Sequence, residues 1–349
     1  MAAFVFLYIY LFFIWLASNN IVDKLNKRRF QCVASGFGLI FLLGLHSPTL
    51  GCDIVGSYAP AFERTGQDFI ASEEESIFGF ELGFMNYMAL VHHITDDVQM
   101  FLFISSIIIV VPVIYVIYMK SRNVMMSVMI YVSWYLYYFS FSGLRQSIAI
   151  SVCAIATIFI FKKKILPFVL IVIGASFIHT SALLFILAYA LYNYKISNKK
   201  ILLAGTLLIA VLLVFKGSMS VVAEIIFGAD SRYGSQLENS EFGGFTIAIV
   251  YFIFTIFQMY ISKNDNKYIT ILMFLTIIQT TGIYSQTIPR LAYYFVPLFA
   301  LSFPEAIKEE ANQKRKIMQA SLLFVFMSFF FMQANSHYLA VTPFKFFWE

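Results

Sequence analysis

The stretch S-F-S-G-L-R-Q-S-I-A-I-S-V-C (Ser140–Cys153) places one cation, Arg145, between two apolar runs that are each long enough to enter a lipid bilayer. A charged side chain in that setting is costly unless it meets a partner, water or the lipid headgroups. Either the arginine anchors the chain at the membrane surface, or it has a function. The side of the membrane that it faces separates these two interpretations, and the rest of the chain supplies that orientation.

The composition is that of an integral membrane protein. Of 349 residues, 60% are hydrophobic and only 12% are charged, whereas soluble domains carry roughly 25% charged residues. The apolar runs approach the ~20 residues that one helical crossing needs. Because lipid cannot satisfy unpaired backbone groups, and because these runs lack the alternation of barrel strands, they predict helices. The predicted fold class is therefore all-α, a polytopic helical membrane protein.

The apolar runs predict about twelve transmembrane helices in one integral membrane domain, residues 1–349, with both termini outside. The spans are expected at residues 3–17, 33–45, 98–119, 124–141, 147–161, 201–215, 245–261, 268–282, 291–303 and 317–334, with a pair of short helices in 165–192. That pair meets near residues 174–181, because lysines flank both of its ends.

Two outer loops follow from this topology, residues 46–97 and 216–244. In the first loop, residues 78–94 are apolar enough to suggest a further span. Glu81, His92 and His93 interrupt them, and a span there would place Lys120 outside the membrane. The segment is therefore expected to form an interfacial or re-entrant helix on the outer side.

The basic residues set the orientation, because loops that carry Lys and Arg stay in the cytoplasm. Most of the 24 Lys and Arg fall in loops assigned to the inside. The outer cations are Arg64, Arg145, Lys216, Arg232, Arg290 and Lys345. The net charge of +5 follows this topology and implies no nucleic-acid partner.

Two arginines are expected in the first turns of helices that begin on the outer side. Ser142 and Gly143 are candidate caps for the helix that contains Arg145. Pro289 suits a first helical position and places Arg290 in the first turn of a later helix. Guanidinium groups are permanently charged and bind phosphate oxygens in a bidentate manner, so two of them suit a diphosphate. The alternative is that both arginines only anchor the chain at the interface.

A third helix start lies beside a titratable group. Thr180 and Ser181 are expected to cap a short helix next to His179. Helix N-termini present free N–H groups and a partial positive charge, which together favour anions such as phosphate. Three such N-termini on one side of the membrane suggest a shared anion site, although His179 taken alone also fits a histidine buried in the core.

The first outer loop adds carboxylates and aromatic rings. Asp53 and Glu81 are candidates for removing a proton from an acceptor hydroxyl, as is His179. Tyr58 and Tyr87 are candidates for stacking on sugar rings. In the second loop Arg232 is a candidate glycan ligand, with an ordinary solvated charge as the alternative.

Several kinds of site have no signature in this chain. There is no Gly-rich phosphate loop after a strand and no serine nucleophile elbow. The three cysteines lack the spacing of a disulfide framework or a zinc site, and the carboxylates lack the spacing of a metal site for nucleotide sugars. A reaction without metal or cofactor on a diphosphate carried by a membrane lipid therefore fits best.

Five motifs resemble the EpsG-like branch of the Wzy-type O-antigen and exopolysaccharide polymerases. They are Y-F-S-F-S-G-L-R-Q-S-I-A-I (Tyr138–Ile150), F-I-H-T-S-A-L (Phe177–Leu183), R-L-A-Y-Y-F (Arg290–Phe295), G-C-D-I-V-G-S-Y (Gly51–Tyr58) and F-E-L-G-F (Phe80–Phe84). One departure is that family members usually carry an arginine shortly before the Gly-x-Asp element, where this chain reads L-H-S-P-T-L-G. His46 and Arg64 are the candidates to replace it.

The resemblance implies a glycosyltransferase that joins undecaprenyl-diphosphate-linked oligosaccharides at the outer face of the bacterial inner membrane. The residues implied in binding the diphosphate are Arg145, Gln146 and Arg290. The arginines would stabilise the charge that develops as the glycosidic bond breaks. His179, Asp53 or Glu81 would orient or deprotonate the acceptor hydroxyl. A regulator of polysaccharide chain length is an implied partner, together with the lipid bilayer.

Two other functions remain open on the sequence. An O-antigen ligase would use similar residues and differ in its product. A flippase for lipid-linked oligosaccharide belongs to a different class and predicts charges inside the spans and internal repeats. The chain shows neither of these transporter features.

Overall fold

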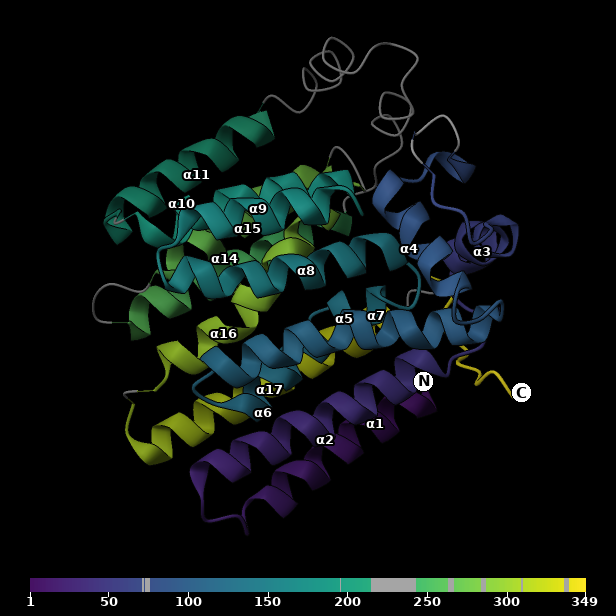
Figure 1. Cartoon of the computed structure of the whole chain (residues 1–349). Coiled ribbons are helices and arrows are strands. Elements are labelled where there is room, and N and C mark those ends of the chain that lie inside the picture. Colours follow the sequence, from purple (N-terminus) through teal and green to yellow (C-terminus); the bar gives the residue numbers. More distant parts are fainter. Residues whose placement is uncertain are drawn as a thin grey trace. The chain divides into compact units, whose positions relative to one another are not determined.

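A computed structural model describes most of the chain, and the elements are labelled in Figure 1. The described residues are 1–70, 72, 76–194, 196–214, 243–262, 267–283, 287–308, 310–335 and 339–349. Within them the chain is helical and has no strand, so the predicted all-α class of polytopic membrane protein is confirmed. The chain divides into two compact units, unit 1 (Met1–Ile186 with Lys308–Glu349) and unit 2 (Leu187–Ile307).

Unit 1 contains most of the long helices. They are α1 (Ala2–Ser18), α2 (Lys24–Gly44), α3 (Ala59–Arg64), α4 (Leu82–His92), α5 (Val98–Lys120), α6 (Val124–Ser133), α7 (Leu136–Phe139), α8 (Leu144–Phe161), α9 (Ile165–Ser176) and α17 (Asn312–Ala334), with the π-helix η1 (Ile54–Tyr58) and the 3-10 helices η3 (Ile77–Gly79) and η4 (Thr180–Ile186). Helices α2, α5, α8 and α9 pack against one another in that order.

Capping residues set where three of these helices begin. Asp23, Asp97 and Asn123 are the N-caps of α2, α5 and α6, and each side chain accepts a hydrogen bond from a backbone N–H in the first turn. Such caps satisfy N–H groups that have no partner inside the helix. At the other end of α5, Arg28 donates to the carbonyls of Ile117 and Ser121 at 2.9 and 2.8 Å. This arginine therefore joins α2 to the last turn of α5.

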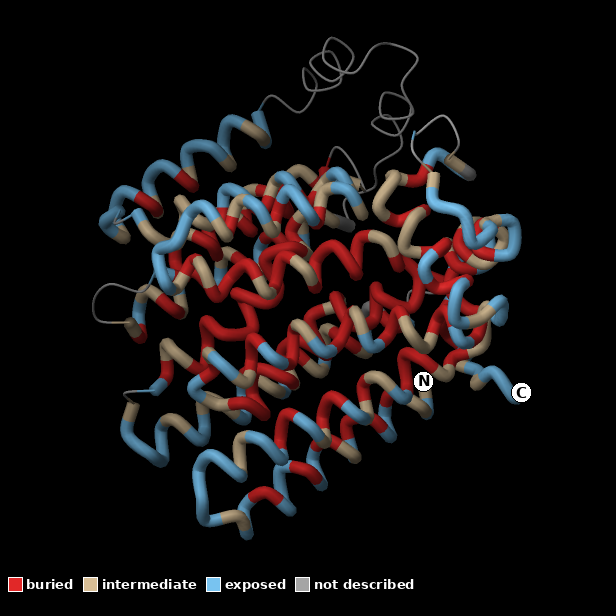
Figure 2. Tube along the Cα trace, in the orientation of Figure 1, coloured by how far each residue is buried: buried red, intermediate tan, exposed pale blue. Residues whose placement is uncertain are grey.

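Helix α8 is the most enclosed of the long apolar helices. Among the residues that the structure describes, three helices, α5, α8 and α17, are long and apolar enough to cross a membrane. In the most apolar 18-residue stretch of α8, 72% is buried within the protein, against 17% in that of α17. Figure 2 shows this burial along α8. Six further apolar helices are shorter, so the number of spans stays a prediction. The enclosure of α8 matters for function because Arg145 lies in its first turn.

The segment expected as a re-entrant helix forms α4. Its 11 residues extend about 16 Å at 1.5 Å per residue, which is about half of the ~30 Å hydrocarbon core of a bilayer. The expected break in the pair of short helices also occurs, because α9 ends at Ser176 and helix resumes at Thr180.

Both chain termini lie at the end of unit 1 that carries α3 and α4, opposite the α1–α2 connection (Figure 1). The C-terminal segment pairs with the chain that follows α2. The backbone N–H groups of Gly51 and Cys52 donate to the carbonyls of Ala340 and Leu339, both at 3.1 Å. The beginning of the first predicted outer loop is therefore held by the end of the chain. Which side of the membrane this end faces stays a prediction.

Unit 2 is built around α15. Its elements are α10 (Leu187–Asn193), α11 (Asn198–Val214), α14 (Gly243–Ile261), α15 (Tyr268–Thr280), α16 (Val296–Ala306) and the 3-10 helices η6 (Thr281–Ile283) and η7 (Ile288–Phe295). Helix α15 packs against α14, α11, α10 and η7. Gly205 allows α11 to approach α15, because a Cβ there would lie 2.3 Å from the Met273 sulfur. Residues 216–242 of the second predicted loop lie outside the described residues. The single membrane domain stays a prediction.

Candidate functional site

The carboxylate of Glu81 connects three segments that are far apart in the sequence. Its Oε2 accepts a hydrogen bond from Arg145 Nη1 at 2.6 Å, and its Oε1 accepts one from His179 Nδ1 at 2.7 Å. The backbone N–H of Thr180 donates to the same Oε1 at 3.1 Å. We call Glu81, Arg145 and His179 the Glu81 cluster. The cluster lies entirely within unit 1.

The Glu-x-Gly element positions this carboxylate. Glu81 is the N-cap of α4 and has an extended backbone. Two residues later, the N–H of Gly83 donates to the carbonyl of Phe177 at 2.8 Å. A Cβ at position 83 would lie 2.5 Å from that carbonyl oxygen, so only glycine permits the approach. The motifs F-E-L-G-F and F-I-H-T-S-A-L are therefore neighbours in space.

Arg145 is the second residue of α8, in the first turn as predicted. The expected cap by Ser142 is wrong. Gly143 is the N-cap, and no side chain caps the helix. Ser142 Oγ instead accepts a hydrogen bond from the backbone N–H of Asp53 at 3.1 Å. The serine is used to attach the first outer loop to the start of α8, which leaves the first turn of α8 without a side-chain cap.

Protein groups surround the guanidinium of Arg145. Its Cζ lies 4.1 Å from the centre of the Phe80 ring and 5.9 Å from that of Tyr58, distances at which a cation is attracted to an aromatic face. The side chain is 20% exposed, and its buried Nε has no partner among the described residues. Contacts with the protein, and not headgroups alone, therefore hold this cation.

The electrostatics of the cluster keep Glu81 ionised. Burial alone would raise the pKa of its carboxyl. The hydrogen bond and charge of His179, together with the charge of Arg145, instead lower the pKa to about 2. A carboxylate with so low a pKa is a poor proton acceptor at neutral pH. Because it can only accept hydrogen bonds, it holds the proton of neutral His179 on Nδ1 and leaves Nε2 as the basic nitrogen.

The structure brings Asp53 to the start of α8 but not into the Glu81 cluster. Asp53 is half-buried, and within the described residues its carboxylate makes no hydrogen bond to Arg145 or His179. Gly51 sets this approach, with φ at +85° and room for no Cβ, which would lie 2.1 Å from the Phe141 carbonyl oxygen. The Gly-x-Asp element therefore docks against the turn that precedes Arg145.

The two tyrosines expected to stack on sugars differ in burial, since Tyr58 is buried and Tyr87 is half-buried. Tyr58 is 5% exposed and packs against Phe80 and Phe84. Burial raises the pKa of its hydroxyl, and Arg145 partly opposes this shift. Tyr87 bonds Ser105 at 2.7 Å, and burial raises its pKa as well. Burial therefore speaks against sugar stacking by Tyr58, whereas the role of the half-buried Tyr87 stays a prediction. Tyr58 supports Arg145, and Tyr87 joins α4 to α5.

The remaining predicted ligands have different outcomes. Gln146 follows Arg145 in α8, and its side chain is buried. Arg290 lies in η7, where its N–H donates to Thr287 at 3.1 Å. It belongs to unit 2, so its convergence with Arg145 stays a prediction. Arg232 lies outside the described residues.

The two candidates to replace the arginine that family members carry before the Gly-x-Asp element differ in their surroundings. His46 is 2% exposed, and burial lowers its pKa to about 4 despite its contact with the Leu43 carbonyl. It is therefore neutral and enclosed at pH 7. Arg64 is exposed at the end of α3, over the ring of Phe78 at 5.6 Å. His46 is therefore unsuited to replace the arginine, and the suggestion of Arg64 stays a prediction.

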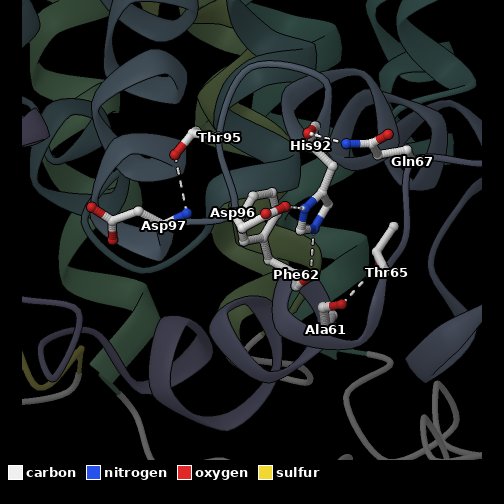
Figure 3. A network of polar contacts seen from close by, with 8 residues as sticks. All are labelled: Ala61, Phe62, Thr65, Gln67, His92, Thr95, Asp96 and Asp97. Carbon is white, nitrogen blue, oxygen red and sulfur yellow. Dashed lines mark hydrogen bonds and ion pairs between the residues drawn. The ribbon is translucent and has the colours of Figure 1, made fainter.

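A second histidine–carboxylate pair, which the sequence analysis did not predict, lies at the other end of α4 (Figure 3). His92 Nδ1 contacts Asp96 Oδ1 at 2.8 Å, and its Nε2 donates to the Phe62 carbonyl at 2.7 Å. The ring stacks on Phe62 with 4.0 Å between centroids. The Gln67 amide also donates to the His92 carbonyl at 3.1 Å. The spacing of His92 and Asp96, four residues apart, was the available signal.

The fold and the Glu81 cluster define a helical membrane protein with a site of paired arginine, glutamate and histidine next to a helix N-terminus. A family model described as the EpsG family matches residues 29–346 of the 349. The chain belongs to the EpsG family, as its motifs indicated. Membership fits a polysaccharide-polymerase type of role in general and a bacterial membrane protein. No curated protein and no solved structure matches this chain.

Proposed function

We propose that this protein joins undecaprenyl-diphosphate-linked oligosaccharide units into O-antigen or another exopolysaccharide, at the outer face of a bacterial inner membrane. The observation that carries the proposal is the Glu81 cluster. It combines a fixed guanidinium at an uncapped helix start with a histidine whose Nδ1 is held by a carboxylate. Family membership supports the class of reaction.

Arg145 would bind the diphosphate of the donor lipid. Its guanidinium has five N–H groups, and the hydrogen bond to Glu81 occupies only part of that capacity. The first-turn N–H groups of α8 lie beside it without a side-chain cap, and such groups favour phosphate. Arg290 would supply a second cation, and Gln146 would assist from the next position of α8. As the bond to the sugar breaks, negative charge grows on the leaving diphosphate, and these cations would stabilise it.

His179 would act on the acceptor. In the proposed step the acceptor hydroxyl attacks the anomeric carbon of the donor sugar, the bond to the diphosphate breaks, and the hydroxyl proton passes to His179 Nε2. Glu81 would stabilise the imidazolium that forms, because its ionised oxygen lies 2.7 Å from Nδ1. Asp53 would remain a nearby carboxylate that can orient the acceptor. The lipid carrier would reach the site from the bilayer, and a chain-length regulator is the proposed partner.

The test is reconstituted polymerisation of a defined lipid-linked repeat unit, followed by linkage analysis of the product. We expect long glycans from the native chain, and single repeat units retained on the lipid for Arg145→Ala and Arg290→Ala. Full-length polymer from both variants would refute the assignment of the site. Transfer of finished polymer to another acceptor would indicate a ligase, and movement of the lipid-linked unit without a new glycosidic bond would indicate a flippase.

A further inference from the structure

A cavity of about 750 Å³ lies between α1, α6 and α17 of unit 1. Its polar residues follow the end of α1, precede the start of α6 and lie in the first turns of α17. These are Asn19, Asn123, Lys316 and Gln319. The α1–α2 connection next to Asn19 is at the opposite end of unit 1 from α4 (Figure 1). The cavity is therefore separate from the Glu81 cluster, and its volume falls in the ~300–1,000 Å³ range of ligand pockets.

Most of the residues that line this cavity are apolar. They include Leu11, Phe12 and Trp15 of α1 and Met129 of α6. Phe12 is 53% exposed and Trp15 is 45% exposed, so these rings are not covered by the rest of the protein. In a bilayer, large apolar side chains left open on neighbouring helices contact acyl chains. Flexible methionines also adapt to irregular apolar ligands.

The mouth of the cavity is cationic. Lys316 lines it and has no ion-pair partner within the part of the chain that the structure describes. Lys27 Nζ donates to Asn19 Oδ1 at 3.2 Å, which places a second ammonium beside the mouth. By contrast, Lys314 does not line the cavity and pairs with Glu310 at 2.9 Å. Within the described residues neither of these two ammonium groups forms an ion pair with a carboxylate.

We propose that this cavity binds one anionic phospholipid from the leaflet that the basic loops face. Its phosphate would contact Lys316 and Lys27, and an acyl chain would lie along Phe12, Trp15 and Met129. The Asn123 Oδ1 caps α6, which leaves the Asn123 amide N–H groups as donors toward the headgroup. Basic pockets between transmembrane helices on the cytoplasmic side suit anionic lipids, because the leaflet there is negatively charged. This inference does not depend on the proposed polymerase activity.

Trp15 allows a direct test, because the chain has only three tryptophans. The double substitution Trp134→Phe with Trp348→Phe leaves Trp15 as the single fluorophore in the full-length chain. The protein is placed in phosphatidylcholine vesicles that contain increasing fractions of brominated phosphatidylglycerol or of brominated phosphatidylcholine. We expect phosphatidylglycerol to quench Trp15 at a several-fold lower mole fraction. In Lys316→Gln the quenching curve for phosphatidylglycerol should coincide with the curve for phosphatidylcholine. In Lys314→Gln the difference between the two quenching curves should remain.

Coincident quenching curves for the two lipids would overturn the proposal, as would equal effects of Lys316→Gln and Lys314→Gln. Protection of Trp15 from both lipids would show a protein segment in the cavity and would also overturn it. Trp134 packs against Phe326 and Phe329, so its substitution can disturb α17. Native mass spectrometry of the chain with all three tryptophans, extracted from vesicles with equal amounts of both lipids, is the second measurement. We expect the native chain to retain phosphatidylglycerol and the Lys316→Gln variant to lose it. Equal retention of both lipids by the native chain would contradict the proposal.

Discussion

A histidine–carboxylate pair lies at each end of α4, and the distance between the paired nitrogen and oxygen is nearly the same in both. At the first end His179 Nδ1 lies 2.7 Å from Glu81, and at the last end His92 Nδ1 lies 2.8 Å from Asp96. The pairs differ in exposure. The Glu81 side chain is 16% exposed and that of Asp96 is 86% exposed. One carboxylate is enclosed by its partners, and the other lies in solvent.

The two pairs also differ in whether the histidine has a ring nitrogen left that can form a further hydrogen bond. His92 uses both ring nitrogens, since Nε2 donates to the Phe62 carbonyl, and the ring is covered by stacking on Phe62. His179 is 26% exposed, and its Nε2 makes no hydrogen bond within the described residues. A histidine can take part in proton transfer only if one nitrogen is accessible to the substrate. We therefore assign His92 to stability and His179 to the proposed chemistry.

The largest expected loss of activity follows from substitution of Arg145, which contacts the Glu81–His179 pair and has no counterpart at the His92–Asp96 pair. Arg145→Ala should lower polymerisation by ~100-fold or more, as expected when one preorganised charge-stabilising donor is removed. Arg145→Lys should recover only part of this, because an ammonium lacks the planar bidentate geometry. Rates of glycan elongation in proteoliposomes measure the effect. Arg29→Ala is the control, because Arg29 is an exposed arginine of α2, and an equal loss in that control would contradict the assignment.

The next test compares alanine substitutions of the two histidines. His179→Ala should reduce activity by ~100-fold, the lower end of the usual contribution of a positioned proton acceptor, with a smaller effect on unfolding. His92→Ala leaves the buried Phe62 carbonyl without its donor, which should reduce the free energy of unfolding by ~1–3 kcal/mol. Activity per folded molecule should survive that change. Thermal unfolding in detergent and elongation rates are measured together, and the comparison fails if both variants lose the same property.

A smaller effect is expected from the backbone contact that holds the first pair. In Gly83→Ala the new Cβ meets the Phe177 carbonyl oxygen at 2.5 Å, so α4 must move away from the segment that carries His179. Such overpacking should cost ~1–3 kcal/mol of stability and lower the elongation rate. Gly56→Ala is the control, because a Cβ there has nothing within 4 Å. Equal melting temperatures for both variants would show that the close approach is not required.

The smallest effect concerns pH. The folded pKa of Glu81, about 2, lies below its ordinary value of 4.5. The ionised carboxylate therefore stabilises the folded chain fully above pH 4.5, and this stabilisation is lost as the pH falls from 4.5 through 2. Native chain and Glu81→Gln should differ in melting temperature at pH 7 and converge near pH 2. A constant difference across this range would show that the ionised form has no special role.

The sequence predicted the local features of the site with good accuracy. Arg145 lies in a first helical turn, the break before Thr180 is present, and the segment around Glu81 forms a short helix. These features depend on apolar run length, on Gly and Pro, and on interrupting polar residues, all of which act over a few positions. The expectations that failed concerned burial. Tyr58 and His46 are enclosed by segments that no local pattern connects to them.

The sequence by itself therefore determined that this protein is a helical membrane protein of the EpsG family. It also determined that Arg145 lies in the first turn of a helix. Only the tertiary structure decided which carboxylate serves the site. Glu81 lies 64 positions from Arg145 and 98 from His179, and Asp53 was an equal candidate. Packing of α4 against the end of α9, through Gly83 and Phe177, selects Glu81. Contacts over such separations depend on how helices pack, and this information is not contained in any single stretch of sequence.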